Sequence, residues 1–150
     1  MDMASIVKQV KNQTLLHEAN YRKVLRVVPF LRSMHIDSSV WIKTPAHHVE
    51  IKILEVTKYT TAFSFTINYI MNQRWLPQID IAVRCYHDAS VAEVISFQRH
   101  KCFHSRYSYP NPKMYQKNEK QQINRFLSEW LNYCLHTQSR IHSNDIPISL

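Results

Sequence analysis

The sequence has no glycine in 150 residues, and this restricts both its backbone conformations and its binding motifs. Glycine adopts positive φ angles readily and lets a ligand approach the backbone closely. Phosphate-binding P-loops, dinucleotide-binding turns of the GxGxxG type and GxSxG nucleophile elbows all depend on it. These three kinds of site are excluded. Any phosphate must be bound by Lys or Arg side chains or by the amide end of a helix.

The length and composition are typical of one folded domain. A chain of this size buries roughly 68–70% of its unfolded surface. Apolar residues make up 45% of the chain and charged residues 20%, far from a disordered composition. No repeat or linker divides the sequence, so we expect a single domain over residues 1–150, with a core over about 14–136 and frayed ends.

The sequence predicts a cytoplasmic protein without membrane contact. Residues 1–13 include Lys8 and Lys11 and lack the continuous apolar core of a signal peptide. Apolar runs elsewhere are far shorter than the roughly 18 residues of a membrane span. The three cysteines, Cys85, Cys102 and Cys134, are an odd number without a close pair, which favours buried, reduced thiols.

Hydrophobic periodicity predicts an α+β fold. A helical pattern covers residues 14–29, and the period of two that is typical of strands follows over residues 40–97. Four strands are predicted at 49–53, 63–69, 79–85 and 91–97, each with one buried and one solvated face. Short connections indicate an antiparallel meander of four to five strands. A fifth strand is expected through Phe103 and Tyr107.

A second amphipathic helix is predicted near the end of the chain. Asn118 and Gln121 have the spacing of a capping box at its start. Its apolar face, which we expect to pack on the sheet, contains Ile123, Phe126, Leu127, Trp130 and Cys134. The opposite face, with Lys117, Lys120, Asn124 and Ser128, is expected to be solvated.

Several long motifs carry a family resemblance. They include Thr57-Lys58-Tyr59-Thr60-Thr61, Leu76-Pro77, Tyr86-His87-Asp88-Ala89, Val91-Ala92-Glu93-Val94, Tyr109-Pro110-Asn111 and Trp130-Leu131. With residues 16–29, they resemble the YqiB-like family of uncharacterised bacterial proteins from about Leu16 to Leu135. The resemblance implies a bacterial cytoplasmic protein of one domain, and it transfers no catalytic residues because the family has no established activity. Residues 100–104 and the tail after Leu135 depart from the family pattern.

Positive charge is concentrated late in the sequence. Residues 99–125 contain seven Lys or Arg and one acid, Glu119, and supply six of the eight net positive charges. Cations for phosphates and interleaved aromatic rings for bases are typical of a surface for single-stranded nucleic acid. The predicted anion-binding residues are Arg84, Arg106, Tyr107, Tyr109, Lys113, Lys117, Lys120 and Arg125. The alternative is an ordinary solvated surface.

A histidine at a predicted strand turn is the weak candidate for catalysis. His87 has the chemistry of a proton shuttle, with Asp88 or Glu93 to orient it and Arg84 nearby in sequence. Adjacent strand residues point to opposite faces. A hairpin without glycine also needs residues such as Asp and His at unusual backbone angles, so the alternative is a role in the turn.

A metal site has even less support. His100, Cys102 and His104 would share one face of an extended strand and are conceivable zinc ligands. No fourth ligand is evident nearby, and His47-His48 is a weaker candidate. We therefore predict no metal and no cofactor.

Taken together, the residues favour a non-enzymatic basic module that binds RNA, single-stranded DNA or another polyanion. A protein-interaction or regulatory subunit and a small enzyme using His87 and Asp88 are the alternatives. No oligomeric state is predicted.

Overall fold

A computed structural model describes residues 3–71, 74–98, 101–102, 112–137 and 140–143. Two long helices, α1 (Met3–Val27) and α2 (Pro112–His136), accompany one sheet, and a short 3-10 helix (Leu31–Ser33) follows α1. The strands are β1 (Ser39–Lys43), β2 (His48–Val56), β3 (Thr60–Met71), β4 (Arg74–Tyr86), β5 (Val91–Phe97), β6 (Lys101–Cys102) and β7 (Arg140–Ser143).

The sheet is antiparallel, with the strand order β6-β5-β4-β3-β2-β1-β7; β1 to β6 form a meander, and β7 pairs with β1 at its edge. Its four central strands, β2 to β5, confirm the four predicted from the period of two. The structure adds β1, which pairs with β7 from the predicted tail, and the short β6. The strand expected through Phe103 and Tyr107 lies outside the described residues.

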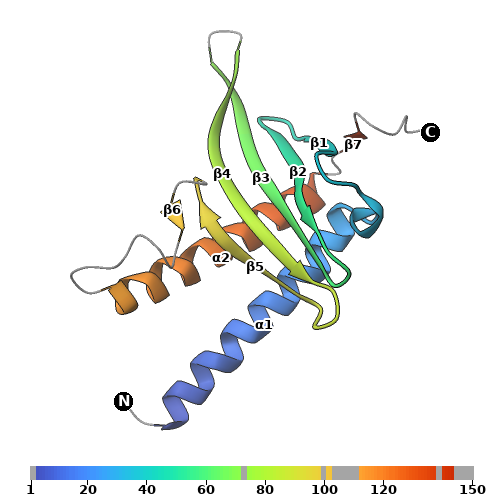
Figure 1. Cartoon of the computed structure of the whole chain (residues 1–150). Coiled ribbons are helices and arrows are strands. Elements are labelled where there is room, and N and C mark those ends of the chain that lie inside the picture. Colours follow the sequence, from blue (N-terminus) through green and yellow to red (C-terminus); the bar gives the residue numbers. More distant parts are fainter. Residues whose placement is uncertain (1–2, 72–73, 99–100, 103–111, 138–139, 144–150) are drawn as a thin grey trace.

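Both helices lie on the same face of the sheet and run side by side in the same direction (Figure 1). Their apolar side chains and those of the sheet form one hydrophobic core, with Val24, Phe63, Phe65, Leu127 and Leu131 almost fully buried. The predicted α+β fold with a helix at each end of the sequence is therefore confirmed.

The two helices begin earlier than predicted. Helix α1 starts at Met3 rather than at residue 14, and its first half extends beyond the sheet (Figure 1), where Met3, Val7 and Leu15 are exposed. It ends before Pro29, which lacks the amide hydrogen that would continue it. Helix α2 starts at Pro112, a residue favoured at the first helical position. Asn118 lies inside the helix, so the predicted capping box is wrong.

Strand β3 is buried on both faces, and the expectation of one solvated face is wrong for this strand. Every residue from Thr61 to Asn68 is buried. Its outward-facing side chains are small, and neighbours cover them. Ala62 lies in register with Glu55 on β2 and Arg84 on β4, whose side chains form an ion pair 3.8 Å long.

The face of α2 that we expected in solvent is instead a junction of three elements. Asn124 is only 1% exposed. Its Oδ1 accepts a hydrogen bond from the Val94 amide of β5 at 2.9 Å, and its Nδ2 donates to the Lys120 carbonyl at 2.8 Å. The Asn124 carbonyl accepts from Asn20 Nδ2 of α1 at 3.1 Å. The prediction failed because helical periodicity does not show that a second helix will cover a polar face.

Three described residues, Asp37, Ser90 and Gln98, have positive φ angles of 68°, 55° and 59°. This conformation costs a residue with a Cβ atom about 1–2 kcal/mol. The turn between β4 and β5 follows the expectation that a hairpin without glycine needs an unusual backbone angle. That angle falls on Ser90, however, and not on His87 or Asp88.

Replacing Asn124 tests the junction. We expect Asn124→Ala to lower the free energy of unfolding by about 1–3 kcal/mol, because the buried Val94 amide loses its acceptor. Urea denaturation measures this loss. Asn132→Ala, on the same helix, is the matched control and should change stability by less than about 0.5 kcal/mol; equal effects of the two substitutions would contradict the assignment.

A glycine at Ser90 should stabilise the protein. Removing the Cβ atom relieves the positive φ angle, and after the extra entropy of glycine in the unfolded chain we expect a net gain of about 0.5–1 kcal/mol. Ala89→Gly in the same turn should lose stability, since Ala89 is not among the residues with positive φ. Thermal unfolding of the two variants decides between these outcomes.

Candidate functional site

The structure describes the side chains of three of the predicted anion-binding residues. Two of them have carboxylate partners. Arg84 pairs with Glu55, and Lys120 Nζ lies 3.3 Å from Glu93 Oε2. Both pairs are partly exposed, so each contributes less than about 1 kcal/mol to stability. The third residue, Arg125, is exposed on α2 and forms no ion pair with a described residue.

The other predicted residues are not described at the level of their side chains. Arg106, Tyr107 and Tyr109 lie outside the described residues. Lys113 and Lys117 belong to α2, but their side chains lie outside the described part of the structure. The strip predicted from sequence therefore stays a prediction at these five positions.

Helix α1 contributes basic residues that the sequence analysis missed. Arg22 and Arg26 are exposed, lie one turn apart on one side of the helix, and form no ion pair within the described residues. Lys23 Nζ donates to Ser128 Oγ of α2 at 2.7 Å across the seam between the helices. Arg125 is exposed and directly follows Asn124, whose backbone carbonyl accepts from Asn20 in that seam. Only the packing of α1 beside α2 brings these residues together, since about a hundred positions separate them.

Arg22, Arg26 and Arg125 lie on the outer surface of α1 and α2, the helix layer. It lies on the side of the helices away from the sheet core, because Tyr21, Val24 and Leu127 are buried against that core.

His87 is held by two hydroxyl groups. Its Nδ1 lies 2.9 Å from Tyr21 Oη and its Nε2 lies 2.8 Å from Thr61 Oγ1. Burial lowers the His87 pKa below its ordinary value, and the nearby Arg32 lowers it further. The imidazole is therefore mostly neutral at pH 7, a state in which one ring nitrogen donates and the other accepts.

The structure does not bring Arg84 and His87 together. Arg84 shares a face of the sheet with Glu55 and Glu93, whereas His87 contacts Tyr21 on the helix side. Asp88 is exposed. His87 joins α1 to the sheet through Tyr21 and Thr61, and among the described residues Arg84 and Asp88 do not converge on it.

A second partly buried histidine, His17 of α1, lies near the ion pair of Lys120 and Glu93. Burial lowers the His17 pKa; the Glu93 carboxylate opposes this effect, and Lys120 adds to it. Glu93 Oε1 also accepts a hydrogen bond from Tyr86 Oη at 3.1 Å. Glu93 thus links β5 to Tyr86 of β4 and to Lys120 of α2.

The remaining candidates carry no chemistry in the described part of the chain. No group of three or more metal-binding side chains occurs there; His100, His104 and the Cys102 side chain fall outside it. Cys85 and Cys134 are free and buried, and burial raises the pKa of these thiols to about 12 and about 11. They stay protonated and unreactive at neutral pH. Neither described helix combines the length and apolar character needed to cross a membrane.

The lowered pKa values of His17 and His87 predict that the stability of the protein depends on pH. Folding lowers the pKa of His17 and His87 below 6.5, so the unfolded chain binds more protons in mild acid. Their contribution to stability is complete above pH 6.5 and is lost as the pH falls through the lowered values. We expect a lower urea midpoint at about pH 5.5 than at about pH 7.5.

Substitution should identify the source of that dependence. His87→Gln should reduce the difference between the two midpoints, and the double variant with His17→Gln should reduce it further. The exposed His35 is the control, and His35→Gln should leave the difference unchanged. A full difference in the double variant would assign it to other groups.

Comparison with known proteins identifies the family. A family model described as "Protein of unknown function (DUF1249)" matches residues 23–140. The chain is 40% identical to the uncharacterized protein YqiB of Escherichia coli (strain K12) over 121 residues, which cover 80% of this chain and 84% of that protein. YqiB of Escherichia coli O157:H7 matches to the same extent. No solved structure matches the chain. The resemblance inferred from its motifs is confirmed, and the chain belongs to the DUF1249 family of proteins of unknown function.

Proposed function

We propose that the protein is a non-enzymatic cytoplasmic module that binds single-stranded nucleic acid on its helix layer. The observation that carries the proposal is the exposure of Arg22, Arg26 and Arg125 on two adjacent helices, without an ion pair to any described residue. Arginines in this state are available to phosphate oxygens, which they bind through paired N–H donors.

The helix layer is a better candidate than the surface around β4 and β5. A phosphate that approached Arg84 or Lys120 would compete with Glu55 or Glu93 and would meet the negative charge of these carboxylates. A phosphate at Arg22 or Arg26 displaces only water and mobile ions. The release of counterions from the nucleic acid then favours binding.

The charge of the two helices supports the same surface. Helix α1 contains five Lys or Arg and one Glu. Helix α2 contains four Lys or Arg and two Glu. Arg22 and Arg26 lie about 6 Å apart along the helix axis, comparable to the separation of successive phosphates in a single strand. Glu18 and Glu129 lie one turn from Arg22 and Arg125 and weaken the local potential without pairing at ion-pair distance.

Part of the strip predicted from sequence extends this surface in the proposal. Lys113 and Lys117 precede Arg125 on α2, and Tyr107 and Tyr109 would supply the rings on which bases stack. The cytoplasmic location is also part of the proposal, and it is supported by the free thiols of Cys85 and Cys134, the cysteines whose side chains the structure describes.

Fluorescence anisotropy with a labelled single strand of about 20 nucleotides tests the proposal. We expect affinity to fall tenfold or more between about 50 and 200 mM salt if roughly three phosphates are contacted. The triple variant Arg22→Gln, Arg26→Gln, Arg125→Gln should weaken binding and lower the slope of log affinity against log salt by about 2.

Two control variants separate the candidate surfaces. The double variant Arg84→Gln, Lys120→Gln removes the same kind of charge from residues with carboxylate partners and should change affinity much less. Lys113→Gln with Lys117→Gln tests the strip predicted from sequence. Absent or salt-independent binding would overturn the proposal. Recovery of one stoichiometric partner protein that survives nuclease treatment would favour the alternative of a protein-interaction subunit.

A further inference from the structure

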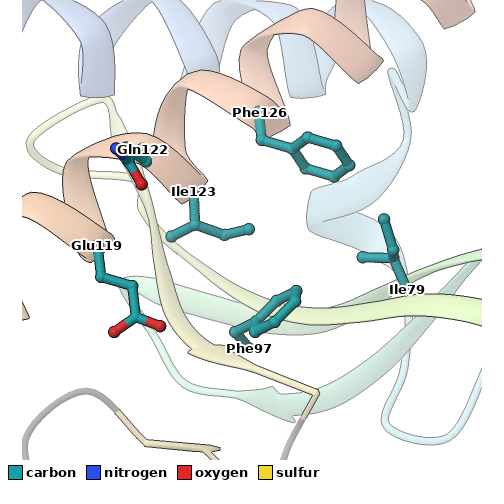
Figure 2. A pocket seen from close by; sticks show the side chains of 6 residues that line it. All are labelled: Ile79, Phe97, Glu119, Gln122, Ile123 and Phe126. Carbon is teal, nitrogen blue, oxygen red and sulfur yellow. The ribbon is translucent and has the colours of Figure 1, made fainter.

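A cavity of about 280 Å³ lies between the first half of α2 and strands β4 and β5 (Figure 2). The described residues that line it are Ile79, Phe97, Glu119, Gln122, Ile123 and Phe126. The helix packs tightly against the core at Leu127 and Leu131, whereas Ile123 and Phe126 are only partly buried. The cavity thus occupies the part of the helix–sheet contact where the core is not closed.

The cavity has an apolar part and a polar end. Figure 2 shows Glu119 and Gln122 at one end and Ile79 and Phe126 at the other, with Ile123 and Phe97 between them. Two branched aliphatic side chains and two aromatic rings suit a compact apolar group. The volume is near the lower limit for small-molecule pockets, roughly 300–1,000 Å³, so the occupant is small.

Glu119 is the polar lining residue that lacks a described hydrogen-bond donor. Its Oε2 atom is buried and has no hydrogen-bond partner among the described residues. The adjacent Lys120 is directed to Glu93 and does not neutralise it. A buried carboxylate oxygen without a donor is costly, and a bound donor at this end of the cavity would remove that cost.

We propose that this cavity is a binding site for a small amine with an aromatic or branched apolar group. The apolar group lies among Ile79, Phe97, Ile123 and Phe126, and the ammonium donates to Glu119. A carboxylic acid with the same apolar group would place a negative charge against Glu119, and a neutral alcohol would donate only an uncharged hydrogen bond. The site is separate from the helix layer and does not depend on nucleic-acid binding.

Three probes that share a phenylethyl group and differ in the charge of the polar end test the charge preference. Isothermal titration calorimetry of the full chain with 2-phenylethylamine, 2-phenylethanol and 3-phenylpropanoate should give the tightest binding for the amine and the weakest for the acid. Equal binding of the amine and the acid, or no saturable binding of amine up to about 10 mM, would overturn the proposal.

Variants test the residues. Glu119→Gln keeps the shape of the side chain and should weaken amine binding about tenfold or more, with little effect on the alcohol. Glu129→Gln, an exposed carboxylate on the same helix, is the matched control and should bind like the unaltered protein. Wild-type affinity in Glu119→Gln would refute the role of the carboxylate.

The apolar part has its own test. Ile123→Trp fills the cavity and should abolish binding of both the amine and the alcohol, with circular dichroism as the check on folding. In the unaltered protein, nuclear Overhauser effects should connect the bound ring to the methyl groups of Ile79 and Ile123, and this measurement needs no variant. Contacts only to residues elsewhere would place the ligand outside the cavity and overturn the assignment.

Discussion

The hydrogen bonds of Asn124 join the three parts of this structure. The buried Asn124 side chain accepts from the Val94 amide of strand β5 and donates to the Lys120 carbonyl of its own helix. The backbone carbonyl of Asn124 accepts from the Asn20 side chain of α1. Beyond its short pairing with β6, β5 is an edge strand, and such an edge needs cover. Burying these polar groups is favourable only if each has a partner, so the junction sets how α2 lies along β5 and beside α1.

That arrangement decides which charges remain available. With α2 along the edge of β5, Lys120 reaches Glu93, while Arg125, the residue after Asn124, is exposed to solvent. With α1 beside α2, Arg22 and Arg26 join Arg125 on one surface. The same placement leaves Glu119 and Gln122 at the polar end of a cavity that is otherwise lined by Ile79, Phe97, Ile123 and Phe126. The basic residues thus separate into those that pair with a carboxylate, Arg84 and Lys120, and those without an ion pair among the described residues, Arg22, Arg26 and Arg125.

Sequence periodicity predicted the regular elements well and the polar contacts poorly. The alternating pattern around Phe63 and Phe65 identified β3, and the helical pattern through Leu127 and Trp130 identified α2. The capping-box spacing predicted that α2 starts at Asn118, but the helix starts at Pro112. Proline is also favoured at the first position of a helix. The Lys120–Asn124–Ser128 face was assigned to solvent, since amphipathicity separates apolar from polar residues and does not separate exposed polar residues from buried ones.

The sequence by itself determined that this protein is a helix–sheet–helix chain of the DUF1249 family, that glycine-based phosphate sites are absent, and that its charge is strongly positive. These properties depend on local periodicity, residue identity and composition, all of which are visible in a linear chain. Tertiary structure alone decided that Arg84 and Lys120 meet carboxylates, that Arg22 lies on the same layer as Arg125, and that Glu119 borders an apolar cavity. Such pairings depend on distances between residues far apart in sequence, and packing of the helices on the sheet sets those distances.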